Sequence, residues 1–249
     1  MKINVHAGHN PDGKIACGAV GLIKESTEAR KVKNSVVSML KSMGHTVYDC
    51  TVNDGTSQND VLKKIVDKCN SHDVDLDVSI HFNSGRNDKT GDGKTGGTEV
   101  LVYTENSTQK ERAAKICESI SELGFTNRGV KYSNSLYVLK HTKAPAILVE
   151  CCFVDDKDDV KIYNYKKMAE AIVLGITGKK PSTSTSTDTS YLVKITALLL
   201  NVRTGPSKDY GVVTQVRNGE VYTIVKNQNG WGKLKSGAGW ICLKYTDRV

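Results

Sequence analysis

The sequence predicts two domains, an α/β domain with a twisted, largely parallel sheet and helices on both faces, and then a small all-β barrel. Three observations lead to this prediction. Strand-like and helix-like segments alternate over residues 1–177, which is typical of a parallel sheet covered by helices. Residues 178–190, GKKPSTSTSTDTS, contain no apolar residue and indicate a linker. Residues 191–249 hold short strand-like segments separated by Gly, Pro and Asn turns.

The first half of the α/β domain alternates strand, helix, strand, helix and strand. Lys2–Val5 is strand-like, and a helix is expected from Glu25, where apolar residues recur at helical spacing until Gly44, a natural residue after a helix end. Residues 45–52 are strand-like again, and residues 75–83 form a further strand. Between them, a second helix is predicted from an apolar stripe formed by Val61, Leu62, Ile65, Val66 and Cys69.

The second half continues this alternation. Residues 97–104 are strand-like, and a third helical stripe follows at Ala113, Ile116, Cys117, Ile120 and Leu123. The segments LYVL (136–139) and AILVE (146–150) are predicted as short buried strands, and a last helix is expected from about residue 159 to residue 176. In sheets of this kind, functional groups gather beyond the carboxyl ends of the strands.

The charge is concentrated in the C-terminal part. Residues 1–178 carry 24 Lys and Arg against 23 Asp and Glu, whereas residues 179–249 carry 11 against 4. A net charge of +7 there indicates an anionic partner, such as a cell-wall polymer. Nucleic acid is not expected, because the sequence has no P-loop, no dinucleotide fingerprint and no basic helix suited to a DNA groove. Membrane insertion is not expected either, because no apolar run is long enough to span a bilayer.

The cysteines and the N-terminus both suggest synthesis in the cytoplasm. The seven cysteines contain no C-x-x-C pair, so we expect reduced, structural thiols, including the vicinal pair Cys151 and Cys152. A secretory signal is not expected, because strand-like sequence begins at Lys2 without a preceding apolar segment.

Candidate chemistry lies at the ends of the predicted elements. His9 follows the first strand, His81 and Glu150 end two others, and Glu25 opens the first helix. Two imidazoles and a carboxylate can hold a catalytic zinc with one position open for water, and a further carboxylate can then act as general base. Taken alone, the same residues could instead be polar side chains that are satisfied within the protein.

Five segments of the first domain resemble motifs of the zinc-dependent N-acetylmuramoyl-L-alanine amidases, the cell-wall hydrolases found as phage endolysins and bacterial autolysins. They occur in the family's order over residues 1–177: INVHAGHNPDGKIACGAVGLIKE, VSIHFNS, GGTEVLVY, NRGVK and PAILVECCF. The resemblance implies that His9, Glu25 and His81 bind zinc and that Glu150 is the catalytic acid and base.

Several other residues have more than one interpretation. His6 stands where the family usually has an acidic residue, so we expect it beside the metal site or simply buried. Glu28 competes with Glu25 for the ligand position, and Glu25 is favoured because the first helical residue can reach the sheet edge. Asn83 either orients a ligand or binds substrate, and His141 either contacts substrate or is a solvated loop residue. The two remaining histidines, His45 and His72, are expected on the surface.

The second domain resembles a bacterial Src-homology-3 type module through LNVRTGPS, NGEVYTIV, GWGKL and GWICL. Such modules bind wall components, and the positive charge would suit teichoic or other anionic polymers. Exposed aromatic rings could stack on sugars or peptides. For Trp231 both stacking and packing within the barrel are considered, and for Trp240, inside an alternating strand, packing is favoured.

Together these features predict a peptidoglycan amidase with zinc as its cofactor, made without a signal peptide and acting on the bacterial wall after release, as a phage or prophage endolysin does. Its expected partners are peptidoglycan and anionic wall polymers. One alternative is another zinc hydrolase that acts on wall peptides or acetylated sugars. The other is a wall-binding protein without catalytic activity.

Overall fold

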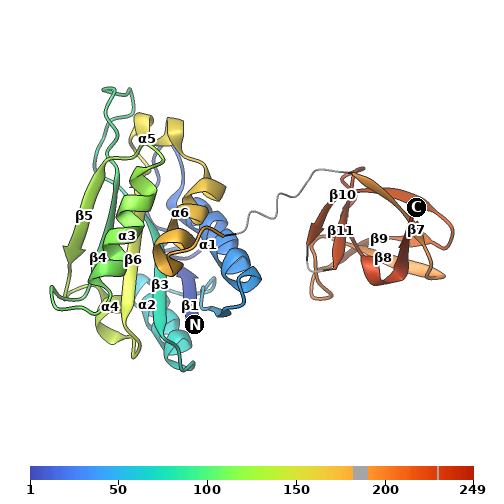
Figure 1. Ribbon diagram of the computed structural model, residues 1–249, viewed down its shortest axis with the longest axis horizontal. Coiled ribbons are helices and arrows are strands. Elements are labelled where there is room, and N and C mark those ends of the chain that lie inside the picture. Colours follow the sequence, from blue (N-terminus) through green and yellow to red (C-terminus); the bar gives the residue numbers. More distant parts are fainter. Residues whose placement is uncertain (182–189, 229) are drawn as a thin grey trace. The chain divides into compact units, whose positions relative to one another are not determined.

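The computed structural model contains two compact units, Met1–Ser182 and Thr183–Val249 (Figure 1). It describes residues 1–181, 190–228 and 230–249, so most of the expected linker 178–190 lies outside the described residues. Each unit has its own buried apolar clusters, two in the first and one in the second.

A six-stranded sheet forms the centre of the first unit, in the order β2-β1-β3-β6-β4-β5. Every neighbouring pair is parallel except β4 with β6, which is antiparallel. This confirms the predicted, largely parallel sheet. The strands are β1 Lys2–Ala7, β2 Thr46–Asp49, β3 Leu76–Asn83, β4 Thr98–Val102, β5 Asn127–Tyr132 and β6 Ala146–Phe153.

Helices cover both faces of this sheet, as predicted (Figure 1). One face carries α1 Glu25–Ser42, α3 Lys110–Ser121 and α6 Tyr165–Thr177, with α6 in contact with both α1 and α3. The other face carries α2 Gln58–Asn70 and α4 Tyr137–His141. No helix in the described part of the chain combines the length and the apolar character needed to cross a membrane.

The prediction of a strand at residues 136–139 is wrong, because Leu136 precedes the short helix α4 and the other three residues form its first turn. A four-residue apolar run has no periodicity that separates strand from helix. Here Val138 and Leu139 are buried in the cluster that α2 also lines. The end of α4 is fixed by the side-chain amide of Asn70, which donates to the carbonyl of His141 at 2.9 Å.

Two further elements differ from the prediction. The expected last helix is two helices, α5 Lys157–Ile162 and α6, because the Asn164 side chain accepts hydrogen bonds from the Lys166 and Lys167 amides and starts a new helix. The strand β5 was not predicted. It lies at the edge of the sheet and has no buried residue, so it shows no apolar alternation in the sequence.

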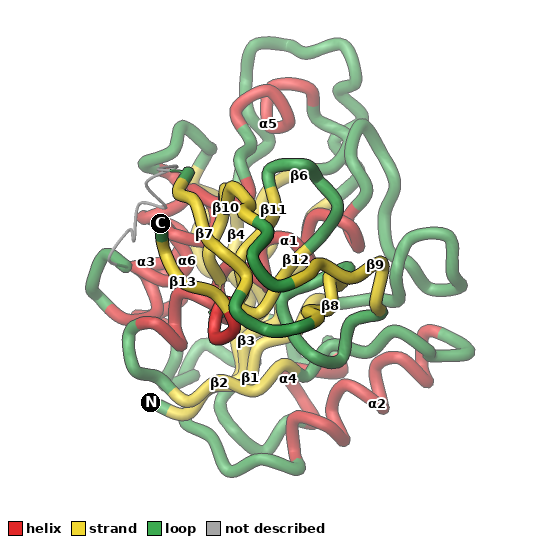
Figure 2. The backbone as a smooth tube through the Cα atoms, turned by 90° about the vertical axis from the view of Figure 1, so that its right-hand side faces the viewer, coloured by secondary structure: helices red, strands yellow, loops and turns green. Residues whose placement is uncertain are grey.

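The second unit is a seven-stranded antiparallel sheet in the order β13-β7-β10-β11-β12-β8-β9 (Figure 2). The sheet surrounds one apolar cluster. Its antiparallel strands confirm the predicted all-β class. Trp231 and Trp240 are each 9% exposed, so packing accounts for both indoles. The elements are β7 Tyr191–Ile195, β8 Leu199–Arg203, β9 Val212–Arg217, β10 Val221–Gln228, β11 Trp231–Leu234, β12 Trp240–Cys242, a 3-10 turn at Leu243–Tyr245 and β13 Thr246–Arg248.

The seven cysteines are free thiols, as expected from the sequence. Cys151 and Cys152 are fully buried on β6, and burial raises the pKa of both thiols well above the usual value. Both therefore stay protonated at neutral pH and act as small apolar residues of the core.

Candidate metal centre

The loop after β1 places His9 at the carboxyl edge of the sheet. His9 has a positive φ of 66°, which is uncommon for a residue with a side chain. Gly8 lies against the ring of His81, since a Cβ added to Gly8 would stand 2.0 Å from Cε1 of that ring. Gly18 leaves space in the same way, because a Cβ there would stand 2.5 Å from Oε2 of Glu25. The two glycines let the backbone approach the site closely.

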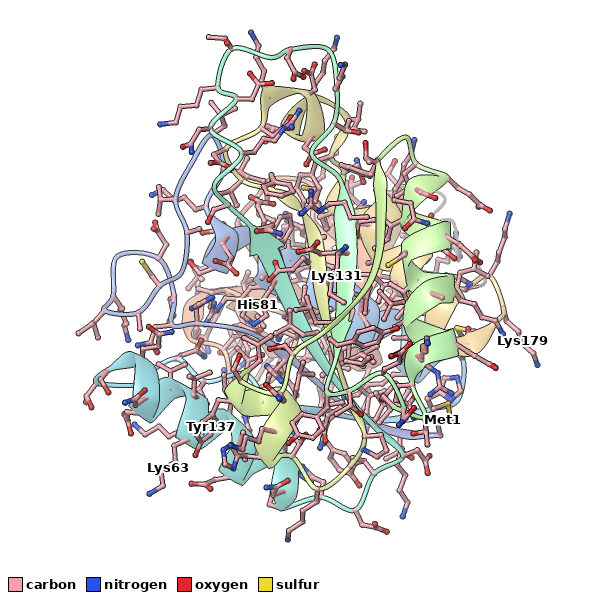
Figure 3. All side chains as sticks on the ribbon, turned by 90° about the vertical axis from the view of Figure 1, so that its left-hand side faces the viewer. Met1, Lys63, His81, Lys131, Tyr137 and Lys179 are labelled. Carbon is pink, nitrogen blue, oxygen red and sulfur yellow. The ribbon has the colours of Figure 1, made fainter. Side chains whose placement is uncertain are left out.

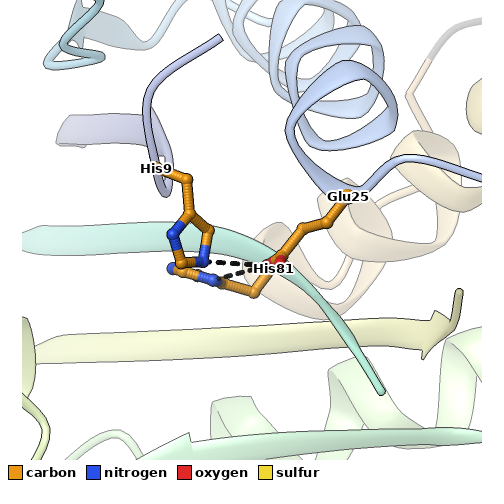
Figure 4. A group of neighbouring side chains, drawn as sticks. All are labelled: His9, Glu25 and His81. Carbon is orange, nitrogen blue, oxygen red and sulfur yellow. Dashed lines mark hydrogen bonds and ion pairs between the residues drawn. The ribbon is translucent and has the colours of Figure 1, made fainter. Parts of the chain in front are cut away.

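His9, Glu25 and His81 meet at this edge, as Figure 4 shows. Oε1 of Glu25 lies 2.9 Å from Nδ1 of His81 and 3.2 Å from Nε2 of His9. The two imidazole rings meet edge to face, with their centroids 4.9 Å apart. One potential ligand atom from each of the three residues lies within 4.8 Å of the others.

Glu25 is held as a carboxylate although it is 3% exposed. Burial opposes its ionisation, but contacts with His81 and His9 more than offset this and hold its pKa well below the usual range. Backbone amides also donate to it, from Phe82 to Oε1 at 3.2 Å and from Ala19 to Oε2 at 2.8 Å. The side chain is therefore fixed in position with its negative charge directed at the two imidazoles.

Glu150 lies beside this group on the next strand. It pairs with His81 of β3 on one side and with Glu99 of β4 on the other, so the three side chains share one face of the sheet. Oε2 of Glu150 is buried and has no hydrogen-bond partner in the part of the chain that the structure describes. Burial, followed by the charges of Glu25 and Glu99, raises the pKa of Glu150 to about 8. Among the described residues, no positive charge acts on this carboxyl group to stabilise its ionised form.

This face of the sheet is covered by helices only in part. α2 and α4 cover its lower part in Figure 3, with Tyr137 on α4, while His81 lies above them. His81 lies toward the carboxyl end of β3. The side chains of His9 and His81 remain partly exposed, at 23% and 14%.

The donor set fits zinc by its chemistry. Two imidazole nitrogens and one carboxylate are a ligand set that Zn²⁺ accepts, with a fourth position left for water. The buried, unpartnered oxygen of Glu150 is consistent with a cation at this place, because a positive charge lowers the cost of keeping that carboxylate ionised.

The structure also places the other candidate residues. His6 is 1% exposed, with Nδ1 3.5 Å from Oγ of Ser79, and burial, followed by the charge of His81, lowers its pKa to about 3. Glu28 turns away from the group, and its carboxylate contacts Lys31 at 2.7 Å and the Tyr163 hydroxyl at 3.2 Å. These contacts leave Glu25 as the carboxylate that meets the two imidazoles.

Asn83 lies on β3, two residues beyond His81. Its side-chain amide donates to Oε1 of Glu99 at 2.9 Å, and Nε of Arg128 donates to Oε2 of Glu99, also at 2.9 Å. Glu150, Glu99 and Arg128 thus form a row of polar side chains that runs from β6 across β4 to β5. Glu99 and Arg128 were not predicted as site residues, although they lie in the motifs GGTEVLVY and NRGVK. Only the strand register shows that Glu99 is the neighbour of Glu150 and that Arg128 contacts Glu99.

The remaining histidines lie outside the site. His141 is exposed at the end of α4, where its ring lies 4.3 Å from that of Tyr137. His45 and His72 were expected on the surface, but both are half-buried. The ring of His72 stacks on Tyr48 at 4.0 Å, and the ring of His45 lies 3.2 Å from the N-terminal amine.

A second group of carboxylates, Asp88, Asp156 and Asp158, also brings its oxygens within 4.8 Å of one another. Their oxygens already have hydrogen-bond partners within the protein. Nε of Arg86 lies 3.0 Å from Asp156, and backbone amides of residues 91–93 donate to Asp88 and Asp158. This group, whose Asp156 is fully buried, ties the loop at residues 88–93 to the start of α5 and does not include the residues of the site at His9.

The second unit has a pocket of about 210 Å³ on its surface. Two cationic side chains, Arg203 and Lys208, line it, and none of the described carboxylates does. Lys208 forms no hydrogen bond or ion pair with the described residues. The rest of the lining is formed by Ala197, Leu199, Leu200, Asn201, Trp231, Cys242 and Tyr245. A ligand that is anionic at one end and apolar elsewhere would match this lining.

The fold and the site together define an α/β domain with a His–Glu–His donor set and a neighbouring carboxylate at the carboxyl edge of its sheet. The sequence profile of the N-acetylmuramoyl-L-alanine amidase family matches residues 3–178, and that of the bacterial SH3 domain matches residues 198–246. The chain belongs to the N-acetylmuramoyl-L-alanine amidase family and carries a bacterial SH3 domain. The resemblance inferred from the sequence motifs is thereby confirmed.

Similar proteins come from clostridia and from phages. An uncharacterised Clostridium perfringens protein, CPE1502, is 37% identical over 169 residues, which cover 67% of this chain and 48% of that protein. The endolysin of Bacillus phage SPP1 is 32% identical over 164 residues, 63% of this chain and 56% of its own length. The chain thus spans about half the length of these relatives.

A solved structure with the same fold is the catalytic domain of the CD27L endolysin, which targets Clostridia Difficile. It superposes with a TM-score of 0.64 at 27% identity, covering 72% of this chain and 98% of that domain. The superposition agrees with the α/β class of the first unit.

Proposed function

We propose that the protein is a zinc-dependent peptidoglycan hydrolase that cleaves the amide bond between the lactyl group of N-acetylmuramic acid and L-alanine. The observation that carries this proposal is the convergence of His9, Glu25 and His81 beside Glu150 in a chain of the amidase family. We further propose that it acts on the bacterial wall as an endolysin does, since the phage relative is named as one.

In this proposal His9, Glu25 and His81 hold the zinc. When bound, zinc acts as a Lewis acid that makes water nucleophilic at neutral pH and polarises a carbonyl group. Glu25 also supplies a negative charge, which Phe82 and Ala19 hold in place through their amides. The imidazoles bind the metal in their neutral form, so acid protonates them and weakens binding.

Glu150 moves the proton. As water adds to the lactyl carbonyl carbon, the carboxylate of Glu150 accepts a proton from that water. When the C–N bond breaks, Glu150 returns a proton to the leaving amine of L-alanine. The products are the carboxylate of the lactyl group and a stem peptide with a free N-terminus. Glu99 and Arg128 lie next along the same face and are placed to contact the substrate rather than the reacting bond.

Mass spectrometry of digested walls tests the bond that is cut. The expected products are stem peptides that begin with L-alanine and glycan strands that keep their acetyl groups. Release of acetate would instead indicate a deacetylase, and new amino groups at other stem residues would indicate a peptidase. Walls that remain intact would support a protein that only binds them.

Replacing Gly8 by Ala is expected to weaken zinc binding, because the new Cβ would stand 2.0 Å from Cε1 of His81 and force that ring to move. Competition with a chromophoric chelator measures the affinity. Gly13→Ala is the matched control. Gly13 has φ +79° and nothing within 4 Å of its would-be Cβ, so this change costs roughly 1 kcal/mol of stability but leaves the site intact. Equal zinc affinity in Gly8→Ala and wild type would contradict the role of Gly8.

We also propose that the second unit tethers the enzyme to the wall through an anionic component. The support is its bacterial SH3 match, its net positive charge and the cationic lining of its pocket. Tethering raises the local concentration of substrate without changing the chemistry. Screening of the charges by salt should weaken it.

A chain that ends at residue 181 is expected to keep its activity on small soluble muropeptides and to lose activity on whole walls. Rates on both substrates, measured at low and high salt, check this result. A shortened chain that digests walls as fast as the full chain would exclude tethering.

The pocket itself is tested with a matched pair of lysine variants in the full-length chain. Lys208→Gln removes a charge from the pocket lining, whereas Lys233→Gln removes the same charge from β11 outside it. A pull-down on purified walls should show weaker binding for Lys208→Gln and a smaller effect for Lys233→Gln. Equal losses would indicate that overall charge, and not the pocket, provides the binding.

A further inference from the structure

We propose that Arg30 is a positioning residue for the metal centre, because its guanidinium group holds the backbone of His9 in the conformation that directs the imidazole at Glu25 and His81. This inference rests on the proposed zinc site and adds a residue to it. Arg30 lies on α1, five residues after Glu25, so one helix would supply both a metal ligand and the support of another ligand.

His9 needs such support because its backbone is strained. A φ of 66° places it in the left-handed region, which is unfavourable for a residue with a Cβ and persists only where the surroundings impose it. If His9 relaxed to an ordinary φ, its side chain would leave the direction that brings Nε2 to 3.2 Å from Glu25. The metal site therefore depends on whatever fixes this residue.

Arg30 makes the contacts that fix it. Its Nη2 donates to the carbonyl oxygen of His9 at 2.9 Å, to that of Val52 at 3.0 Å and to Oδ1 of Asn53 at 2.9 Å. Its Nη1 donates to the carbonyl of Ser26, one turn earlier on α1, at 3.1 Å. The guanidinium thus joins three segments that are separate in sequence, namely α1, the His9 loop and the segment after β2.

The partners of Arg30 are all neutral oxygens. Burial lowers the pKa of Arg30, and within the described residues no carboxylate lies within ion-pair distance of it. A charged side chain whose donors all point to carbonyl and amide oxygens acts through geometry rather than through charge pairing. The planar, five-donor fork of arginine can reach several oxygens at once, which a lysine ammonium cannot do.

Asn10 strengthens the same support. It is fully buried, and its side chain pairs with the backbone of Gly55 in both directions. The amide of Gly55 donates to Oδ1 at 3.1 Å, and Nδ2 donates to the carbonyl of Gly55 at 2.7 Å. Nδ2 also donates to the carbonyl of Ile15 at 2.9 Å. Residues 52–55 therefore anchor both His9, through Arg30, and the residue that follows it.

The test compares Arg30→Lys with Arg112→Lys in the full-length chain. Arg112 lies on α3 and also bonds to neutral oxygens, the Ile176 carbonyl at 3.1 Å and the Gln109 side chain. It has no contact with the metal centre. Zinc affinity is measured by competition with a chromophoric chelator. Arg30→Lys should bind zinc about 10- to 100-fold more weakly, as expected when the support of a metal ligand is lost. Arg112→Lys should bind it as wild type does.

Two further readouts separate positioning from general destabilisation. Thermal unfolding of the metal-free proteins reports the stability lost in each variant. The visible spectrum of the cobalt-substituted proteins reports the ligand geometry, and it should change in Arg30→Lys and not in Arg112→Lys. Should Arg30→Lys fail to fold, Asn53→Ala removes one Arg30 partner at a more exposed place and should weaken zinc binding to a smaller extent.

The outcomes distinguish this inference from the proposed function. Wild-type protein that takes up no zinc would contradict the proposed metal site, and this inference with it. Zinc uptake with equal affinity and equal cobalt spectra in wild type and Arg30→Lys would overturn the positioning role of Arg30 alone. Equal weakening in Arg30→Lys and Arg112→Lys would also overturn it, because the loss would then follow from reduced stability.

Discussion

Replacement of Glu150 by Gln is expected to lower kcat by at least ~100-fold, the usual contribution of a positioned general acid and base. Gln keeps the shape of the side chain but can neither accept the proton of the attacking water nor return it to the leaving amine. Zinc content should remain that of the wild type, because Glu150 lies outside the donor set of His9, Glu25 and His81. Rates on soluble muropeptides, together with metal analysis, check both parts.

Glu99→Gln is the comparison for this change, because loss of a substrate contact should raise KM rather than lower kcat. Glu99 is the next carboxylate along the same face, and it contributes to the raised pKa of Glu150. If Glu150 merely supplied negative charge near the site, the two substitutions would have similar effects. A Glu150→Gln enzyme with near-normal rate would contradict the catalytic role, and one without zinc would indicate that Glu150 is a ligand instead.

The elements that carry the site could be predicted because their signals are local. The apolar stripe of α1 and its end at Gly44 follow the 3.6-residue period, and Gly44 has the positive φ of a residue that follows a helix. β3 and β6 are largely buried strands that carry His81 and Glu150 in their C-terminal halves. A parallel sheet brings such strand ends together, which is why the sequence could suggest that His81 and Glu150 are neighbours.

Other features could not be predicted because they depend on contacts between distant segments. The last three residues of LYVL begin a helix that packs on the apolar surface of α2, and nothing within these four residues reveals that surface. Gly8 lies within the first amidase motif, and Arg30 follows the end of that motif by five residues. Gly8 matters because it lies against the ring of His81, and Arg30 because it bonds to the carbonyl of His9. Contacts between residues so far apart leave no pattern in the sequence.

Wild-type protein is expected to hold about one zinc per chain, and Glu25→Gln is expected to lose it. The neutral amide loses the charge that attracts the metal. Both oxygens of Glu25 accept hydrogen bonds, so the NH₂ group of Gln would face a donor at one of the two positions. The buried polar contact left unsatisfied costs about 1–3 kcal/mol. Metal analysis after dialysis gives the zinc content, and unfolding of the metal-free protein gives the stability loss.

Glu28→Gln is the matched control, because the sequence alone left Glu28 as a competing ligand on the same helical turn. Its carboxylate already contacts Lys31 and Tyr163 and is directed away from the two imidazoles. We therefore expect Glu28→Gln to keep its zinc and to lose at most the modest stability of an exposed ion pair and one hydrogen bond. Loss of zinc in Glu28→Gln with retention in Glu25→Gln would reverse the assignment. Retention in both would mean that neither carboxylate is needed, and the site would then rest on the two imidazoles and another donor.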